Sequence, residues 1–464
     1  MRLVAILAVT CLTACVPAKH SGETAQVSMT RAHEAVPAVS ASAAAVAFAA
    51  PTPTRSQRSN SEIAQDFLDL SFRMESGRTL PVLTRFEGPI TVRMQGQVPA
   101  SAQGDLTRLL SRFRNEAGIN IAQTTAAASI TVEFVPRRTI RNTYANVACF
   151  VVPNVSSWEE FKAARGTGRL DWASLRQRDR AAVFAPADAS PQEVRDCLHE
   201  ELAQALGPLN DLYQLPDSVF NDDNFHTVLT GFDMLVLRAY YAPQLRSGMT
   251  QAQVAAALPG ILAQMNPTGA TGRSHNGGRT PPAWVQTMEQ ALGGSGNAGA
   301  KRAAAERAVQ IANAQGWTDS RLAFSHFAVG RLSIGQDPVA AANAFAEASR
   351  IYRGLPGGQV HAAHVDMQLA ALALSQGHAQ QAVSFADRAI PVVRRAENAS
   401  LLATLMMLKA QALDLAGDSA QAKALRLDSQ AWARYGFGSD AVTRARQRDI
   451  SALAPSRLSM AGRG

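Results

Sequence analysis

The C-terminal third of the chain is organised around three glycines, Gly335, Gly377 and Gly417, which lie about 40 residues apart. Before each glycine runs a stretch rich in Ala, Leu and Met that predicts a helix: Phe324–Leu332, Val365–Leu374 and Leu401–Leu415. After each glycine a small and a large apolar residue recur: Ala382 and Phe385, Ala422 and Leu425, and, if the first turn holds two extra residues, Ala342 and Phe345. The pattern predicts a repeat of helix pairs over 301–445.

Such an array resembles tetratricopeptide-like repeats, with units longer than the usual length of about 34 residues. The resemblance implies that stacked pairs bury a continuous core and that the concave face binds a peptide or protein. The alternative is a plain helical bundle. Residues 294–300 predict a flexible linker before the array, and 446–464 predict a frayed tail.

The N-terminal residues predict the cellular compartment of the protein. A positive residue and a short apolar run precede Leu12–Cys15, which resembles a bacterial lipobox. The resemblance implies a signal peptide over 1–14, a lipid on Cys15 and a location on the periplasmic side of the cell envelope. Val16, in place of an acidic residue, favours the outer membrane; the alternatives are an ordinary signal peptide and a short buried segment. Residues 15–60, rich in Ala, Ser, Thr, Val and Pro, predict a disordered tether.

Residues 61–293 predict an α+β domain. Short apolar or alternating runs indicate strands: Pro89–Met94, Ala128–Val135, Ala148–Val152 and Ala181–Phe184. Apolar residues at helical spacing indicate helices over Ser61–Glu75 and Ala102–Ala117. A further helix is expected after Ser190.

That further helix has clear end signals. Ser190 can act as N-cap, Pro191 suits the first helical position, and Glu193 can complete a capping box, while Gly207 follows the last turn. At about 100° per residue, Glu201 falls in the middle of the apolar face. A carboxylate aimed inward needs a partner. Glu201 is therefore interpreted either as a structural group, bonded to an Arg or to backbone donors, or as a group facing a cleft.

The same helix resembles the metzincin pattern H-E-x-x-H-x-x-G-x-x-H. Glu201 and Gly207 match its glutamate and glycine, whereas Glu200, Gln204 and Asn210 stand at the three histidine positions. Protease zinc is held by three protein ligands that are chiefly imidazole, so two amides and a carboxylate predict no metal and no cofactor. The resemblance implies a metzincin-like domain, with a mixed sheet and an active-site-type helix, that has lost its metal.

The resemblance continues downstream. Asp211 follows Asn210, as an aspartate often follows the third histidine of matrixin-type proteases, and Pro216–Phe220 is similar to their Met-turn, with Phe220 at the methionine position. Leu229–Tyr241 is similar to their closing helix.

The stretch 88–293 also resembles the bacterial domain of unknown function 2927. The residues that carry this similarity are Cys197, the E-E-L-A-Q-A-L-G core from Glu200, Ser218–Asp222, Phe232-Asp233, Leu237-Arg238, Arg246–Met249, Trp284 and Ala291–Gly293. That family implies no known reaction.

The cysteines predict one disulfide. Cys11 would leave with the signal peptide, and Cys149 and Cys197 then remain for the folded part. An even pair in an oxidising compartment favours a bridge. The alternative is two separate buried thiols.

Charge and loop patterns argue against nucleic-acid and nucleotide binding. The net charge is +8, and residues 301–464 hold 19 Lys and Arg against 12 Asp and Glu, a difference of +7. These charges are scattered along helices and do not form a stripe with aromatic residues. The glycine-rich stretch from Gly294 faintly resembles a phosphate loop, but Ala300 stands at the lysine position.

These patterns predict an envelope lipoprotein that acts as an adaptor or scaffold. It would bind an envelope protein or peptide through the repeats and the membrane through its lipid, and its protease-like domain would be silent. The alternative is a metal-independent or atypical hydrolase of peptide or cell-wall substrates that uses Glu201, with Glu200 beside it. Adjacent residues on a helix point about 100° apart, so these two carboxylates would converge poorly. A third possibility is a purely structural envelope component.

Overall fold

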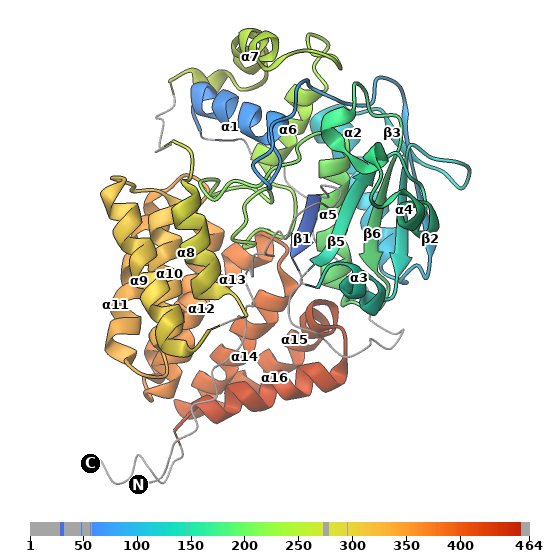
Figure 1. Cartoon of the computed structure of the whole chain (residues 1–464). Coiled ribbons are helices and arrows are strands. Elements are labelled where there is room, and N and C mark those ends of the chain that lie inside the picture. Colours follow the sequence, from blue (N-terminus) through green and yellow to red (C-terminus); the bar gives the residue numbers. More distant parts are fainter. Residues whose placement is uncertain are drawn as a thin grey trace. The chain divides into compact units, whose positions relative to one another are not determined.

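The computed structural model describes residues 28–31, 48, 56, 58–145, 147–271, 278–294 and 296–455. The chain forms two compact units, a sheet domain that ends at Asn276 and a helical domain that begins at Gly277 (Figure 1). Among the described residues, no helix is both long and apolar enough to cross a membrane. Cys15, the expected lipid site, lies outside the described residues.

The sheet domain contains a mixed sheet with the strand order β1-β5-β6-β4-β2-β3 (Figure 1). The strand bounds are β1 Ser28–Arg31, β2 Ile90–Gly96, β3 Ile121–Gln123, β4 Ile130–Val135, β5 Val147–Pro153 and β6 Ala181–Pro186. The strands β6, β4, β2 and β3 run parallel to one another, and β5 runs antiparallel to β6. The strand β1 pairs antiparallel with β5, so the expectation of a disordered tether over 15–60 is wrong for 28–31.

Helices cover both faces of this sheet. The helices of the sheet domain are α1 Asn60–Phe72, α2 Ala102–Ala117, α3 Arg137–Thr143, α4 Trp158–Ala164, α5 Pro191–Leu206, α6 Gly231–Tyr240 and α7 Gln251–Met265. Alternate residues of β5 enter different cores: Val151 packs with α2, α5 and α6, whereas Phe150 packs with Trp158 and Phe161 of α4. Every residue of β5 and β6 is buried.

Burial on both faces, with parallel strands at the centre, defines an α/β domain. The expected mixed sheet is confirmed, and the expected α+β class is narrowed to α/β. The sequence did not indicate the parallel centre, because the short apolar runs of the strands carry no mark of direction and because α3 and α4 are too short to show helical periodicity.

The helical domain consists of consecutive pairs of antiparallel helices. Its helices are α8 Pro282–Leu292, α9 Ala298–Ala314, α10 Ser320–Ser333, α11 Pro338–Gly354, α12 Gln359–Ser375, α13 Ala379–Arg395, α14 Ala399–Leu415, α15 Ser419–Phe437 and α16 Asp440–Leu453. The expected glycine turns join α10 to α11, α12 to α13 and α14 to α15. Helical repeats are thereby confirmed.

The second and third turns share one structure. Gly377 and Gly417 have positive φ values of 82° and 93°, which a residue without a Cβ adopts at low cost. The residues after them return their N–H groups to carbonyls five residues back, His378 to Ala373 and Asp418 to Leu413, both at 2.9 Å. This bond satisfies a carbonyl that the helix end leaves open.

The first turn, at Gly335, differs in length from the other two turns by fewer residues than expected. Ala341, not Ala342, is the fully buried counterpart of Ala382 and Ala422. It lies six residues after Gly335, whereas Ala382 lies five after Gly377. The first turn thus holds one extra residue and not two.

The boundary between the domains also differs from the expected one at 293. The indole N–H of Trp284, on α8, donates to Ser325 Oγ of α10 at 3.0 Å, and its ring lies 5.9 Å from that of Trp317. These contacts place α8 in the helical domain. The expected linker 294–300 already includes the first turn of α9, and the expected tail 446–464 includes the end of α16.

Candidate functional site

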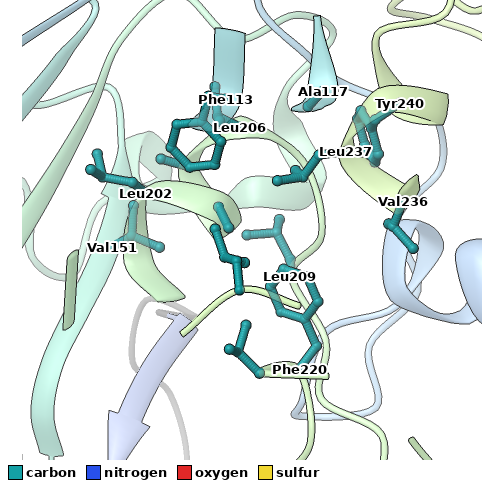
Figure 2. Packing of buried hydrophobic residues seen from close by; sticks show 14 of the residues in the cluster. Phe113, Ala117, Val151, Leu202, Leu206, Leu209, Phe220, Val236, Leu237 and Tyr240 are labelled. Carbon is teal, nitrogen blue, oxygen red and sulfur yellow. The ribbon is translucent and has the colours of Figure 1, made fainter. Parts of the chain in front are cut away.

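The candidate site is built on α5, which lies against the sheet and is covered by α2, α6 and the chain after Gly207 (Figure 2). Ser190 caps the helix as expected, because its side chain accepts from Glu193 N at 3.2 Å. The Glu193 carboxylate does not complete a capping box. It forms an ion pair with Arg137 at 2.6 Å, which attaches the first turn of α5 to α3.

A disulfide fixes the middle of α5 to the sheet. Cys197 on α5 and Cys149 on β5 are bonded, with Cα atoms 6.0 Å apart, which confirms the expected bridge over two free thiols. The bridge closes a loop of 48 residues.

The three positions of the missing histidines lie in packed surroundings. Glu201 and Gln204 are completely buried, and Glu200 and Asn210 are buried as well. Every residue of α5 except Asp196 is buried. The side chains of this helix therefore enter packed surroundings on all sides, whereas a catalytic helix presents one face to a substrate.

Asn210, at the third ligand position, has a structural bond. Its amide Nδ2 donates to the carbonyl of Asp69 near the end of α1 at 3.0 Å. The neighbouring Leu209 N donates to the carbonyl of Leu70, also at 3.0 Å. The chain after α5 is thus bound to α1 at the point where a metzincin would place its last zinc ligand.

Arg178 closes the C-terminal end of α5 and was missed by sequence reasoning. Its guanidinium is buried and donates to the carbonyls of Gln204, Ala205 and Gly207 at 2.6, 2.8 and 2.5 Å. It lies 4.7 Å from the ring centroid of Trp172. A cation at this end satisfies carbonyls that have no partner within the helix and complements the helix dipole. Burial lowers the pKa of Arg178.

Gly207 is required by packing. A Cβ built there would lie 2.9 Å from the ring of Tyr240 on α6, closer than carbon atoms approach. Tyr240, Leu206 and Leu209 belong to one core cluster (Figure 2). The match to the metzincin glycine thus has a local reason in this fold.

The segment expected to resemble a Met-turn is folded against the N-terminus of α6. Phe220, at the methionine position, is completely buried (Figure 2). Asp233 accepts from Ser218 Oγ at 2.5 Å and from Val219 N at 3.2 Å, and it forms a capping box with Thr230. The helix α6 falls within the expected closing segment 229–241.

His199 is the one imidazole of α5, and it acts as a structural acceptor. Its Nδ1 accepts from Leu229 N at 3.1 Å, which fixes the tautomer with the proton on Nε2. Burial, reinforced by the charges of Arg112, Arg195 and Arg108, holds the pKa of His199 well below its usual value. The side chain is therefore neutral near pH 7. Its position fits no ligand pair, because Ala203 stands four residues later.

A second polar cluster surrounds Arg58, just before α1. Arg58 bonds Glu62 at 2.8 Å, contacts Asp66, and lies 3.4 Å from Asp217; its guanidinium also covers the ring of Phe232 at 4.5 Å. Burial raises the pKa of Asp66 to about 6 and that of Asp217 to about 7, although Arg58 opposes both shifts.

Sequence reasoning also missed this cluster around Arg58. The acids Glu62 and Asp66 lie one turn apart on the helix that buries Ile63 and Phe67, and that spacing was a signal. Arg58 pairs with both of these acids, and its third carboxylate partner, Asp217, lies 159 residues away from it in sequence.

Within the described part of the chain, no three His, Cys, Asp or Glu side chains converge as a metal site would need. Ser190 and Arg178 bond the two ends of α5, and Asn210 attaches the chain after it to α1. This arrangement can hold segments in place, and it offers no pair of exposed acid and base groups on α5.

Residues 60–260 match the model of a family described as protein of unknown function, DUF2927. The chain thus carries a DUF2927 domain followed by helical repeats. The match starts earlier and ends earlier than the resemblance over 88–293, and its end agrees with the assignment of α8 to the helical domain. No curated protein and no solved structure matches the chain.

Proposed function

We propose that the protein is an envelope lipoprotein that acts as a protein-binding adaptor. Its helical repeats bind a peptide or protein, and its DUF2927 domain is a metzincin-like module without catalysis. The observation that carries the second part is the structural use of the ligand positions: Gln204 is buried in the core and Asn210 bonds the Asp69 carbonyl.

The metzincin-like interpretation is supported by the order of elements. A mixed sheet precedes α5, α5 carries Glu201 and ends at Gly207, and the buried Phe220 follows before α6. This order of elements is what supports the proposal. The resemblance is one of scaffold, because the groups that chemistry would need are absent from the ligand positions.

The adaptor role is supported by the repeated helix pairs. The helices α12 and α14 are buried along nearly their whole length, whereas α13 fully buries one stripe, Ala382, Ala386, Ala389 and Val393, and leaves its other residues half-buried or exposed. Stacked pairs of this type present a row of outer helices to a partner. A tetratricopeptide-like concave surface for an envelope peptide is the finer form of this proposal.

The envelope location rests on the lipobox at Leu12–Cys15. The disulfide fits it, since such bonds persist in oxidising compartments. Growth with labelled palmitate should label the wild-type protein and leave C15A unlabelled; label on both proteins would refute the anchor.

In-cell crosslinking tests the adaptor role. A photo-reactive amino acid at Val339, which is 71% exposed on α11, should attach a defined envelope protein. The matched control is the same probe at Val98, which is 40% exposed in the sheet domain. The same products from both positions, or none from Val339 and from other outer positions of α13, would refute the role.

The hydrolase alternative has a direct test. Purified protein should hold no stoichiometric metal by mass spectrometry and should not hydrolyse peptide or cell-wall substrates. Stoichiometric zinc, or turnover that is lost in E201Q and kept in E200Q, would establish the alternative. The complete burial of Glu201 argues against it, because a catalytic carboxylate must reach substrate or water.

A further inference from the structure

Two aromatic side chains of α15 and one small residue of α14 form an open cluster in the helical domain. Tyr435 and Ala399 are buried and Trp432 is partly buried. Gly436 allows this arrangement, since a Cβ there would lie 2.6 Å from the backbone of Ser400. The helix α15 can thus pass close to the first turn of α14. We call Trp432, Tyr435 and Ala399 the aromatic cradle.

Phe48 occupies this cradle. Its ring centroid lies 5.7 Å from that of Trp432, with the planes tilted by 57°, and 5.2 Å from that of Tyr435, in an edge-on arrangement of 79°. Both distances fall in the range of favourable aromatic pairs. Trp432 also lies under the guanidinium of Arg394, at 5.3 Å from the ring centroid. Phe48 groups with the helical domain, although in sequence it lies between β1 and α1 of the sheet domain.

The sequence around Phe48 identifies it as an anchor. It is the one Phe, Trp or Tyr in residues 1–66, and it lies within Ala41–Ala50, where the other residues are Ala, Val and Ser. A segment of such small side chains offers little contact area, so one aromatic ring carries most of what a partner can hold.

We infer that the aromatic cradle is a binding site for an aromatic side chain and that Phe48 of the same chain is its resident ligand. Phe48 is thereby bound to the helical repeats in cis. Because ligand and site share one chain, the ligand is present at an effective concentration of roughly millimolar. A free peptide of the same type must compete with it. The inference holds whether or not the repeats bind an envelope partner.

Chymotrypsin cleavage after Phe48 in the full-length protein tests the contact, because a bound ring is a poor substrate. Cleavage, followed by mass spectrometry of the released N-terminal fragment, should be at least about tenfold faster in W432A than in the wild type. The matched control is L427A, which removes an exposed side chain of the same helix and should leave the rate unchanged. Equal rates in W432A and the wild type, with helical content preserved, would overturn the inference.

A second experiment avoids changes in the helical domain. A labelled peptide of residues 41–50 should bind the F48A protein, in which the aromatic cradle keeps its own residues and has lost the ring of Phe48. It should bind the wild type at least about tenfold more weakly, since Phe48 competes. A peptide with alanine at position 48 should bind neither. Absence of binding to F48A, or equal binding to both proteins, would refute the assignment even if W432A fails to fold.

Discussion

Replacement of Arg178 by methionine tests how the end of α5 is stabilised. The change keeps an unbranched apolar stem, shorter than that of arginine, and removes three charge-assisted hydrogen bonds to the carbonyls of Gln204, Ala205 and Gly207, together with one to Thr84 Oγ1. Hydrogen bonds to a charged group contribute about 1.5–3 kcal/mol each. The variant no longer buries a cation, which offsets several kcal/mol of this loss. We expect the free energy of unfolding of the sheet domain to fall by about 3 kcal/mol.

Hydrogen exchange measured by mass spectrometry gives a local assay. Peptides that cover Pro191–Leu206 should exchange faster in R178M, while peptides from α14 should keep their wild-type rates, because the loss is local to the sheet domain. Urea unfolding followed by tryptophan fluorescence adds the global value, with Trp172 as the reporter next to Arg178.

The matched control is R176M, two residues away and exposed. Its unfolding free energy should stay within about 0.5 kcal/mol of the wild type. If R178M also stays within that limit, or if the two variants behave alike, the guanidinium is not what holds the end of α5, and the reasoning is refuted.

Three further predictions concern packing, protonation and the disulfide. G207A should lower stability by about 1–3 kcal/mol through overpacking against Tyr240, whereas G104A, where no described atom lies within 4 Å of the added Cβ, should be neutral or stabilising; equal urea midpoints for both would contradict this. The pKa values of Asp66 and Asp217 are raised to about 6 and about 7, so the folded state binds more protons than the unfolded state above about pH 4. These two groups therefore make the free energy of unfolding fall as the pH rises towards 7. The urea midpoints at pH 5 and pH 8 should differ less in D217N than in the wild type, and an unchanged difference would count against the cluster. The variant C149A/C197A removes the disulfide that closes a loop of 48 residues, and the chain-entropy model predicts that the free energy of unfolding falls by about 4 kcal/mol. Calorimetry of the unfolding transition of the sheet domain can measure this loss. A loss under about 1 kcal/mol would show that the bridge constrains the unfolded chain little.

Local signals predicted the elements that local chemistry determines. The helix α2 has the bounds that its apolar spacing indicates, Ala102–Ala117. Ser190 and Gly207 marked both ends of α5, and Gly377 and Gly417 marked turns of the repeat, because a cap or a positive φ leaves a residue-level trace. The disulfide followed from the count of cysteines.

Contacts between segments that are far apart in sequence could not be predicted from such local signals. The bonds of Arg178 to the end of α5 and the ion pair of Arg137 with Glu193 depend on how strands and helices stack. The strand β3 is three residues long, too short for an alternating pattern. The burial of Glu201 was predicted from helical spacing, whereas the hydrogen bond of Asn210 to α1 required the fold.

The bond between Asn210 and α1 bears on whether the domain could be engineered to hold a metal ion. Histidines at Glu200, Gln204 and Asn210 would restore the motif on paper. The third would give up the amide that binds the Asp69 carbonyl, and the second would have to fit a bulkier ring where Gln204 is completely enclosed. A metal site at these positions would thus require α1 and the chain after α5 to separate, because the packing of the whole region, and not only three side chains, fills the space.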